Sequence, residues 1–335
     1  MGEGRFIKTL RNNNNERKQI MKGLLDNLAK CCKENDYSIY RIAVLNGENE
    51  ETEQINIRNM NACMNSYSVA KVFTMTAIGL LVDDNLLSVD EKITNILAEE
   101  YANVADERWH NVTVEMALTH KIGLQAGFLD IDAKDPLTFG EDYLTYTLQQ
   151  SLNFEPGTES VYTDAAYYLL ARVVEKRANM PLDTFLWKRL FAPLSFREVA
   201  WSRCPQGHVM GATGLYIRTD DMVKLGALYL NAGKWKEKQI ISEEWVWTAL
   251  AREYEFHKTG YGESYGKGGM FGQMLLVIPE KKCAVAWHGF GVKADELIRL
   301  AALDLLEKNS IRNENARHII VKMMCLAFFG GFTQI

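Results

Sequence analysis

Apolar positions along the chain follow two periods, and the order of these periods predicts the architecture. Segment 16–33 has helical spacing, and two strand-like runs follow at 37–47 and 52–59 around a polar turn. A long middle section returns to helical patterns broken by loops. The clearest helices are predicted over 66–83, 164–178, 182–191, 219–233 and 242–253. Two strands, 269–279 and 281–290, and an amphipathic helix, 292–309, follow them.

This order of elements predicts an α+β fold. The N- and C-terminal segments can form one antiparallel sheet flanked by helices, with the mostly helical middle inserted beside it. We therefore expect one folded unit over 16–309. Its sheet subdomain would comprise 16–66 and 254–309, and its helical subdomain 67–253, while 310–335 would be an apolar tail of unknown role.

Composition and charge exclude several classes of protein. Hydrophobic residues make up 47% and charged residues 24%, as in ordinary globular proteins. The net charge of −5 is spread without a basic stripe, so we expect no nucleic-acid partner. The N-terminus lacks the apolar core of a signal peptide, and the six cysteines show no zinc-binding spacing. We expect a cytoplasmic protein without a metal site.

The segment IIVKMMCLAFFGGF (319–332) is strongly apolar. It carries Lys322 and is shorter than the roughly 20 residues of a membrane-spanning helix. We expect a packed or poorly ordered tail, and a peripheral membrane contact is the alternative.

Candidate chemistry begins at SYSVAK (66–71), where Ser68 and Lys71 stand three positions apart at the start of a helix. Positions i and i+3 share a helix face, so the hydroxyl and the amine can touch. A serine needs a base before it becomes a good nucleophile. Taken alone, this pair also fits a helix cap and a solvated lysine.

Further segments resemble the serine β-lactamase and penicillin-binding-protein superfamily, in particular its class C-related branch of esterases and D-aminopeptidases. These segments are VTVEMALTHKIGL (112–124), NFEPGTESVYTDAAYYLLARVVEK (153–176) and GATGLYIRTDDMVKLGALYLNAGKW (211–235). In the second segment Tyr162 takes the family's tyrosine position and Asp164 its asparagine position. The resemblance spans roughly 35–308 and implies the β-lactamase/transpeptidase-like fold and a nucleophilic Ser68.

The family's third motif, Lys-Thr-Gly, has two candidates in this chain. Residues 258–260 spell it literally, but a glycine-rich stretch that makes a poor strand follows Lys258. Lys267 is followed by Gly268, Gly269 and a convincing hairpin. We therefore assign the motif to Lys267.

The resemblance implies an acyl-enzyme mechanism. Ser68 would attack a carbonyl, Lys71 and Tyr162 would handle its proton, and Tyr162 would protonate the leaving group. Lys267 would hold the site positive and favour a tyrosinate or a substrate anion. The backbone N–H groups of Ser68 and Met270 would form the oxyanion hole. Neither a metal nor a cofactor is implied.

Two residues on the substrate side depart from the family pattern. Asp164 replaces an amide, so it would favour charged lysines and repel a substrate carboxylate. Gly268, beside Gly269, replaces a threonine whose hydroxyl would bind such a carboxylate. We therefore predict a serine hydrolase for a small ester or amide substrate and not an efficient β-lactamase. An acyltransferase and a catalytically inactive binding module remain the alternatives.

Two histidines receive structural interpretations. His120 lies in the segment that resembles the family's Thr-His-x-x-Gly loop, so we expect it to support that loop. His288 follows Trp287 near the end of a predicted strand, where a structural role is favoured over a substrate contact. The sequence does not predict the oligomeric state.

Overall fold

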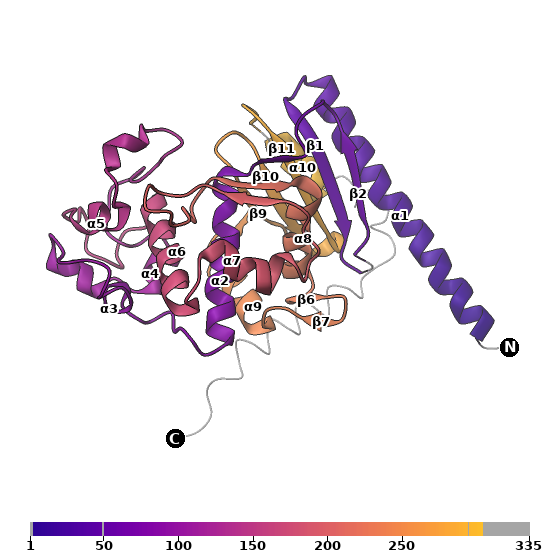
Figure 1. Cartoon of the computed structure of the whole chain (residues 1–335). Helices are drawn as coiled ribbons and strands as arrows, with labels where there is room; N and C mark the ends of the chain where they lie inside the picture. The colour runs from indigo at the N-terminus through magenta and orange to yellow at the C-terminus, as the bar shows by residue number, and fades with distance from the viewer. Residues whose placement is uncertain (1–2, 49, 294, 304–335) are drawn as a thin grey trace.

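A six-stranded antiparallel sheet joins the two ends of the chain, in the order β2-β1-β11-β10-β9-β8 (Figure 1). The computed structural model describes residues 3–48, 50–293 and 295–303. The strands are β1 (Ile39–Asn46), β2 (Thr52–Asn56), β8 (His257–Lys258), β9 (Tyr265–Gly268), β10 (Met274–Ile278) and β11 (Cys283–Gly289). The predicted α+β class and antiparallel sheet are confirmed.

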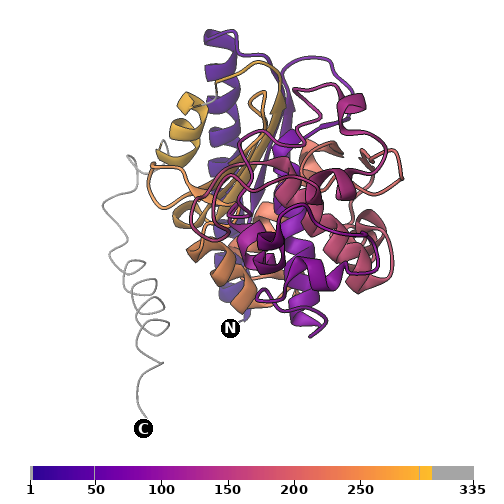
Figure 2. The same ribbon diagram turned by 90° about the vertical axis from the view of Figure 1, so that its left-hand side faces the viewer.

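Alternating side chains of the sheet enter two separate cores. In β1, Ile42 and Val44 join the core beneath α1 (Glu3–Glu34) and α10 (Asp295–Leu303). Ala43 and Leu45 point the other way, into the large core that contains α8 (Thr219–Leu230). Figure 2 shows α1 and α10 on one side of the sheet and the helical part on the other. Each fully buried Leu, Ile or Val contributes roughly 1.5–3 kcal/mol, so this two-sided burial fixes the register.

The helical part is built around α2 (Ala70–Asp83), which contacts α6 (Asp164–Ala178) and α7 (Leu182–Leu186). Residues 70–81 are buried on every side of α2, although the sequence pattern predicts one apolar face. The remaining helices are α3 (Ile93–Ile96), α4 (Val114–Leu118), α5 (Tyr143–Leu148) and α9 (Glu243–Ala251). A second sheet, β3-β5-β4, consists of β3 (Cys63–Asn65), β4 (Val199–Trp201) and β5 (Leu215–Arg218), and β6 (Lys234–Trp235) pairs with β7 (Lys238–Gln239).

Several boundaries differ from the predicted ones. The first helix begins at Glu3, well before residue 16, and the predicted helix 182–191 turns π-helical over Trp187–Phe191. The predicted strand 269–279 begins only at Met274, because 269–273 form the connection between β9 and β10. The closing helix is described as Asp295–Leu303. Residues 304–309 and the predicted tail 310–335 lie outside the described residues.

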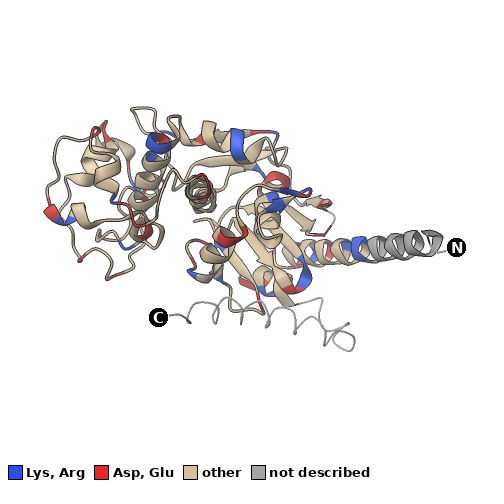
Figure 3. Ribbon diagram, turned by 90° about the horizontal axis from the view of Figure 1, so that it is seen from below, with Lys and Arg blue, Asp and Glu red and all other residues tan. Residues whose placement is uncertain are grey.

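Charge and hydropathy add two facts about the described part of the chain. Lys and Arg residues are interspersed with Asp and Glu over both the sheet and the helical part (Figure 3). None of its helices is both long enough and apolar enough to cross a bilayer.

Although α8 lies within the helical insertion by sequence, it packs on β1, β10 and β11. The division into subdomains over 16–309 remains a prediction.

Candidate active site

A tight turn presents Ser68 between β3 and α2. Ser66 donates its backbone N–H to Leu215, and Tyr67 donates its own to the Asn65 side chain. Tyr67 has φ of +49°, in the left-handed region, which costs a non-glycine residue roughly 1–2 kcal/mol. This strained residue turns the chain into the 3₁₀ turn Tyr67–Val69, which leads directly into α2.

Lys71 lies one turn into the helical segment and is completely buried. Its ammonium donates to Ser68 Oγ at 3.3 Å, to Asp164 Oδ1 at 2.7 Å and to the Ala212 carbonyl at 3.0 Å. Burial alone would lower the pKa of Lys71, but nearby negative charges, chiefly Asp164, hold it above its usual value. Lys71 is therefore an ammonium at neutral pH, and each of its three N–H bonds has an acceptor.

Tyr162 stands between the two lysines of the site. It precedes Thr163, the N-cap of α6, so the start of that helix positions both Tyr162 and Asp164. The Lys71 and Lys267 ammonium nitrogens lie 4.7 and 4.8 Å from the centre of the Tyr162 ring. Lys267 also donates to Tyr162 Oη at 3.3 Å. The tyrosine is 44% exposed, so this side of the site is open to solvent.

A buried carboxylate, Glu255, holds the second lysine. Glu255 is fully buried, forms an ion pair with Lys267 and lies 3.0 Å from His120 Nε2. Burial would raise the pKa of Glu255, but Lys267 and His120 keep it well below its usual value. His120 accepts the Thr163 N–H at Nδ1, which leaves the proton on Nε2, and its ring lies 4.5 Å from that of Tyr162. Glu255 and His120 thus hold Lys267 and Tyr162 in position relative to each other.

The two Lys-Thr-Gly candidates occupy different places. Lys267 is buried on β9 beside Tyr162, whereas Lys258 is exposed on the short outer strand β8. A β-carbon on Gly269 would lie 2.8 Å from the Ser66 carbonyl oxygen, so only glycine lets β9 approach the nucleophile turn this closely. Gly268 has room for a β-carbon, and Met270 follows at the hairpin tip with its side chain 47% exposed.

The structure therefore brings together Ser68, Lys71, Tyr162, Asp164 and Lys267. Sequence reasoning missed Glu255. The signal was present in REYEFHK (252–258), where this glutamate lies between two aromatic residues that are both buried. A charge in such a run needs a partner inside the protein.

His288 has contacts that fit the structural role favoured by the sequence. It is fully buried on β11, with Nε2 3.2 Å from Ser66 Oγ and Nδ1 2.8 Å from Thr219 Oγ1. Burial, assisted by the positive charge of Arg41, lowers its pKa to about 3. His288 thus supports the nucleophile turn from behind as a neutral ring.

Three carboxylates near the site lie close enough together to hold a metal ion. Oxygens of Asp130, Asp132 and Asp164 lie within 4.8 Å of one another. The Asp164 carboxylate contacts the Lys71 ammonium, which supplies a cation there, and Asp132 accepts the Thr213 hydroxyl group. Burial raises the pKa of Asp132. Contacts with other side chains of the protein therefore explain why these carboxylates can lie close together.

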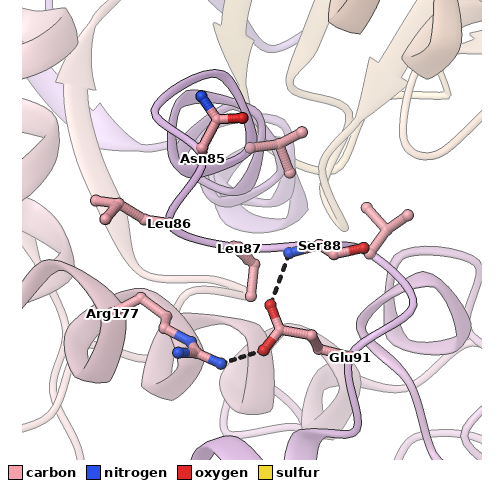
Figure 4. Close-up of a pocket in the computed structure, with 8 residues that line it drawn as sticks. Asn85, Leu86, Leu87, Ser88, Glu91 and Arg177 are labelled. Atoms are coloured by element: carbon pink, nitrogen blue, oxygen red, sulfur yellow. Dashed lines mark hydrogen bonds and ion pairs between the residues drawn. The ribbon is translucent and has the colours of Figure 1, made fainter.

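An open hollow of about 560 Å³ lies at the C-terminal end of α2, away from these residues (Figure 4). Figure 4 shows Leu86 and Arg177 at its wall, and Glu91 accepting from the Ser88 backbone and pairing with Arg177. The charged groups that face the hollow are therefore paired with each other.

Comparison with known proteins identifies the family of this chain. The family model described as Beta-lactamase matches residues 58–303. Penicillin-binding protein 4 of Amycolatopsis lactamdurans is 31% identical over 137 residues, which cover 40% of this chain and 34% of that protein. The matched part thus spans about a third of the length of this curated relative.

Two solved structures share the fold at low sequence identity. A penicillin-binding protein homologue from Caulobacter crescentus superposes with a TM-score of 0.67 at 16% identity, covering 84% of this chain and 96% of that one. EstCE1, described as a hydrolase with promiscuous acyltransferase activity, gives 0.63 at 14% identity, covering 85% and 98%. The chain belongs to the Beta-lactamase family and has the fold that its sequence resemblance implies.

Proposed function

We propose that this protein is a serine hydrolase that acts through an acyl-enzyme on a small, neutral ester or amide. The observation that carries the proposal is the contact of Lys71 with both Ser68 and Asp164, next to a tyrosine held by Lys267. The family match and the hydrolases among the structural neighbours support this chemistry.

The first step is attack of Ser68 Oγ on the substrate carbonyl carbon. Because the Lys71 ammonium donates to Ser68 Oγ, the serine's own proton is free to leave in another direction. Tyr162, acting in its phenolate form, accepts that proton and returns it to the departing alcohol or amine. Lys71 stays protonated and stabilises the negative charge that develops on the serine oxygen.

The second step is hydrolysis of the acyl-enzyme. The backbone N–H groups of Ser68 and Met270 are proposed to bind the carbonyl oxygen in both steps. A water molecule attacks the acyl carbon and gives a proton to Tyr162, and the Ser68 oxygen leaves and takes a proton back. Both steps balance without a redox partner.

The charge of the site favours a neutral substrate. Each lysine beside Tyr162 is paired with a buried carboxylate, Lys71 with Asp164 and Lys267 with Glu255. The site therefore offers little excess positive charge to a carboxylate-bearing acyl donor such as a penicillin. Gly268 also lacks the threonine hydroxyl group that would hydrogen-bond the carboxylate of such a substrate. We expect weak β-lactam turnover.

Acyl transfer to an alcohol or amine is the second candidate, and the activity printed for EstCE1 favours it. The same acyl-enzyme serves both reactions. A small-molecule substrate and a cytoplasmic location remain part of the proposal.

The test is turnover of p-nitrophenyl acetate by the full-length protein, with Ser68→Ala as control. We expect p-nitrophenol release that falls at least roughly 10³-fold in the variant. An added primary alcohol separates the candidates, because a transferase forms a new ester and a hydrolase releases acetate. Equal rates in both proteins would refute the proposal.

A further inference from the structure

Tyr67, Phe271 and Phe290 form a row of aromatic rings that starts at the nucleophile turn. Tyr67 precedes Ser68, and its ring centre lies 4.9 Å from that of Phe271 in an edge-on arrangement. Phe271 stacks on Phe290 with ring centres 4.3 Å apart and planes inclined by 21°. The three residues of this aromatic row come from separate segments, so the fold assembles the row beside Ser68.

The outer part of the row is open to solvent. Phe290 is 50% exposed, and Met270, next to Phe271, is 47% exposed. Single exposed apolar residues are common on protein surfaces, but contiguous groups beside a site mark binding surfaces. The ring contacts make this group continuous from Tyr67 to Phe290.

The hairpin tip that carries Met270 and Phe271 is held in place by a buried side chain. Gln273 is 1% exposed, donates to the Gly289 carbonyl at 2.7 Å and accepts the Phe271 N–H at 3.2 Å. The Phe271 carbonyl accepts the Val292 N–H at 3.2 Å. The row is therefore a preorganised surface, which lowers the entropy cost of binding a ligand.

The charge next to the row is balanced, because Lys71 and Lys267 each have a carboxylate partner. A neutral apolar group gains from contact with aromatic rings and loses nothing to unpaired charge there. We infer that the aromatic row binds an alkyl or aryl group of the substrate, and so selects apolar esters or amides. This inference rests on the proposed function, since it concerns the substrate of Ser68.

The test uses two series of esters with the full-length protein. The first varies the acyl group of p-nitrophenyl esters from acetate through butyrate to octanoate. The second keeps the acetyl group and varies the alcohol from ethanol to hexanol and benzyl alcohol. The readout is the ratio of kcat/KM for the largest and smallest member, in wild type, Phe271→Ala and Phe290→Ala.

Trp247→Ala is the matched control, because Trp247 is 51% exposed but lies on α9. We expect wild type to prefer the larger group roughly tenfold or more in one series, as an apolar contact can provide. The two phenylalanine variants should lose at least about fivefold of that ratio, and the control none. The responding series identifies whether the acyl or the alcohol part occupies the row.

Labelling of Ser68 by a fluorophosphonate, read by intact mass, distinguishes failure of the inference about the aromatic row from failure of the proposed function. Phenylalanine variants that are labelled but keep the wild-type ratios in both series would overturn the aromatic row alone. Wild-type protein that is folded but unlabelled would overturn the proposed function, and the inference with it.

Discussion

Asp164 controls the charge on Lys71, and through it the pH at which the site works. Burial lowers the pKa of Lys71, but the neighbouring groups, Asp164 first among them, together raise it above its usual value. Asp164→Asn keeps a hydrogen-bond acceptor but removes the charge, so the pKa of Lys71 should fall. Lys71 should then lose, at a lower pH, the proton that the proposed mechanism requires it to keep.

We expect kcat/KM for p-nitrophenyl acetate to fall on the alkaline side at a pH at least about one unit lower in Asp164→Asn than in wild type. The measurement is a pH–rate profile from pH 6 to 10 for both proteins. An unchanged profile would show that Lys71 does not set the protonation state of the site.

The buried pair of Glu255 and Lys267 should also matter for stability. Glu255→Gln leaves the Lys267 ammonium buried without its countercharge, which typically costs about 3–5 kcal/mol. Urea unfolding measures this loss. Adding Lys267→Met to Glu255→Gln should restore part of it, because the unpaired charge is gone. Additive losses in the double variant would contradict the pairing.

At the scale of single residues, sequence patterns predicted the site residues that belong to a motif and missed those that do not. Ser68, Lys71 and Tyr162 stand in recognisable spacing, and their neighbours favoured Lys267 over Lys258. Glu255 has no motif. Its partners His120 and Lys267 are 135 and 12 positions away, so only the fold brings them together.

At the scale of elements, the packing of α8 on the sheet depends on Gly226. A β-carbon there would lie 2.9 Å from the Ala284 side chain and 3.3 Å from the Leu276 carbonyl oxygen. Gly226→Ala should therefore push α8 away and cost about 1–3 kcal/mol of unfolding free energy. Thermal or urea unfolding measures the change.

Gly23 on α1 is the matched control, since nothing lies within 4 Å of a β-carbon there. Gly23→Ala should stabilise the protein by roughly 0.5–1 kcal/mol through helix propensity. Stabilisation by both substitutions would mean that α8 does not approach the sheet as closely as described.

Element type was predictable because apolar periods of 2 and 3.6 residues are set by burial. Element ends were harder. The run 269–279 is apolar except for Gln273, yet the hydrogen bonds of Gln273 and the φ of +94° at Gly272 make its first half a turn. The π-helical turn at Trp187–Phe191 leaves the apolar spacing of the predicted helix unbroken, so that spacing could not predict it.

At the scale of the whole molecule, His288 connects the sheet, the nucleophile turn and α8. It contacts the hydroxyl groups of Ser66 and Thr219, and burial lowers its pKa from 6.5 to about 3 on folding. Between these pH values the unfolded chain binds a proton that the folded protein does not. Stability should fall by about 1.4 kcal/mol per pH unit as the pH drops from 6.5 toward 3.

Unfolding free energy measured from pH 7 to pH 4 tests this dependence. His288→Gln removes the titrating group, so its profile should be flatter than that of wild type, even if the variant is less stable at pH 7. Parallel profiles would show that His288 does not contribute.

The overall architecture followed from sequence because strands at both ends of the chain have complementary two-sided patterns. Contact between α8 and the sheet did not follow, since α8 lies inside the helical insertion by sequence. The arrangement still places Ser68, Tyr162 and Lys267, from three distant segments, at one site.

The most direct test of the central claim is intact-mass analysis of the protein quenched in acid during turnover of p-nitrophenyl acetate. The account predicts the added mass of one acetyl group, placed on the peptide that contains Ser68 by digestion of the quenched protein, and its disappearance as the substrate is consumed. Ser68→Ala should show no such adduct. Ester turnover without an adduct, or an adduct that persists in Ser68→Ala, would contradict Ser68 as the nucleophile.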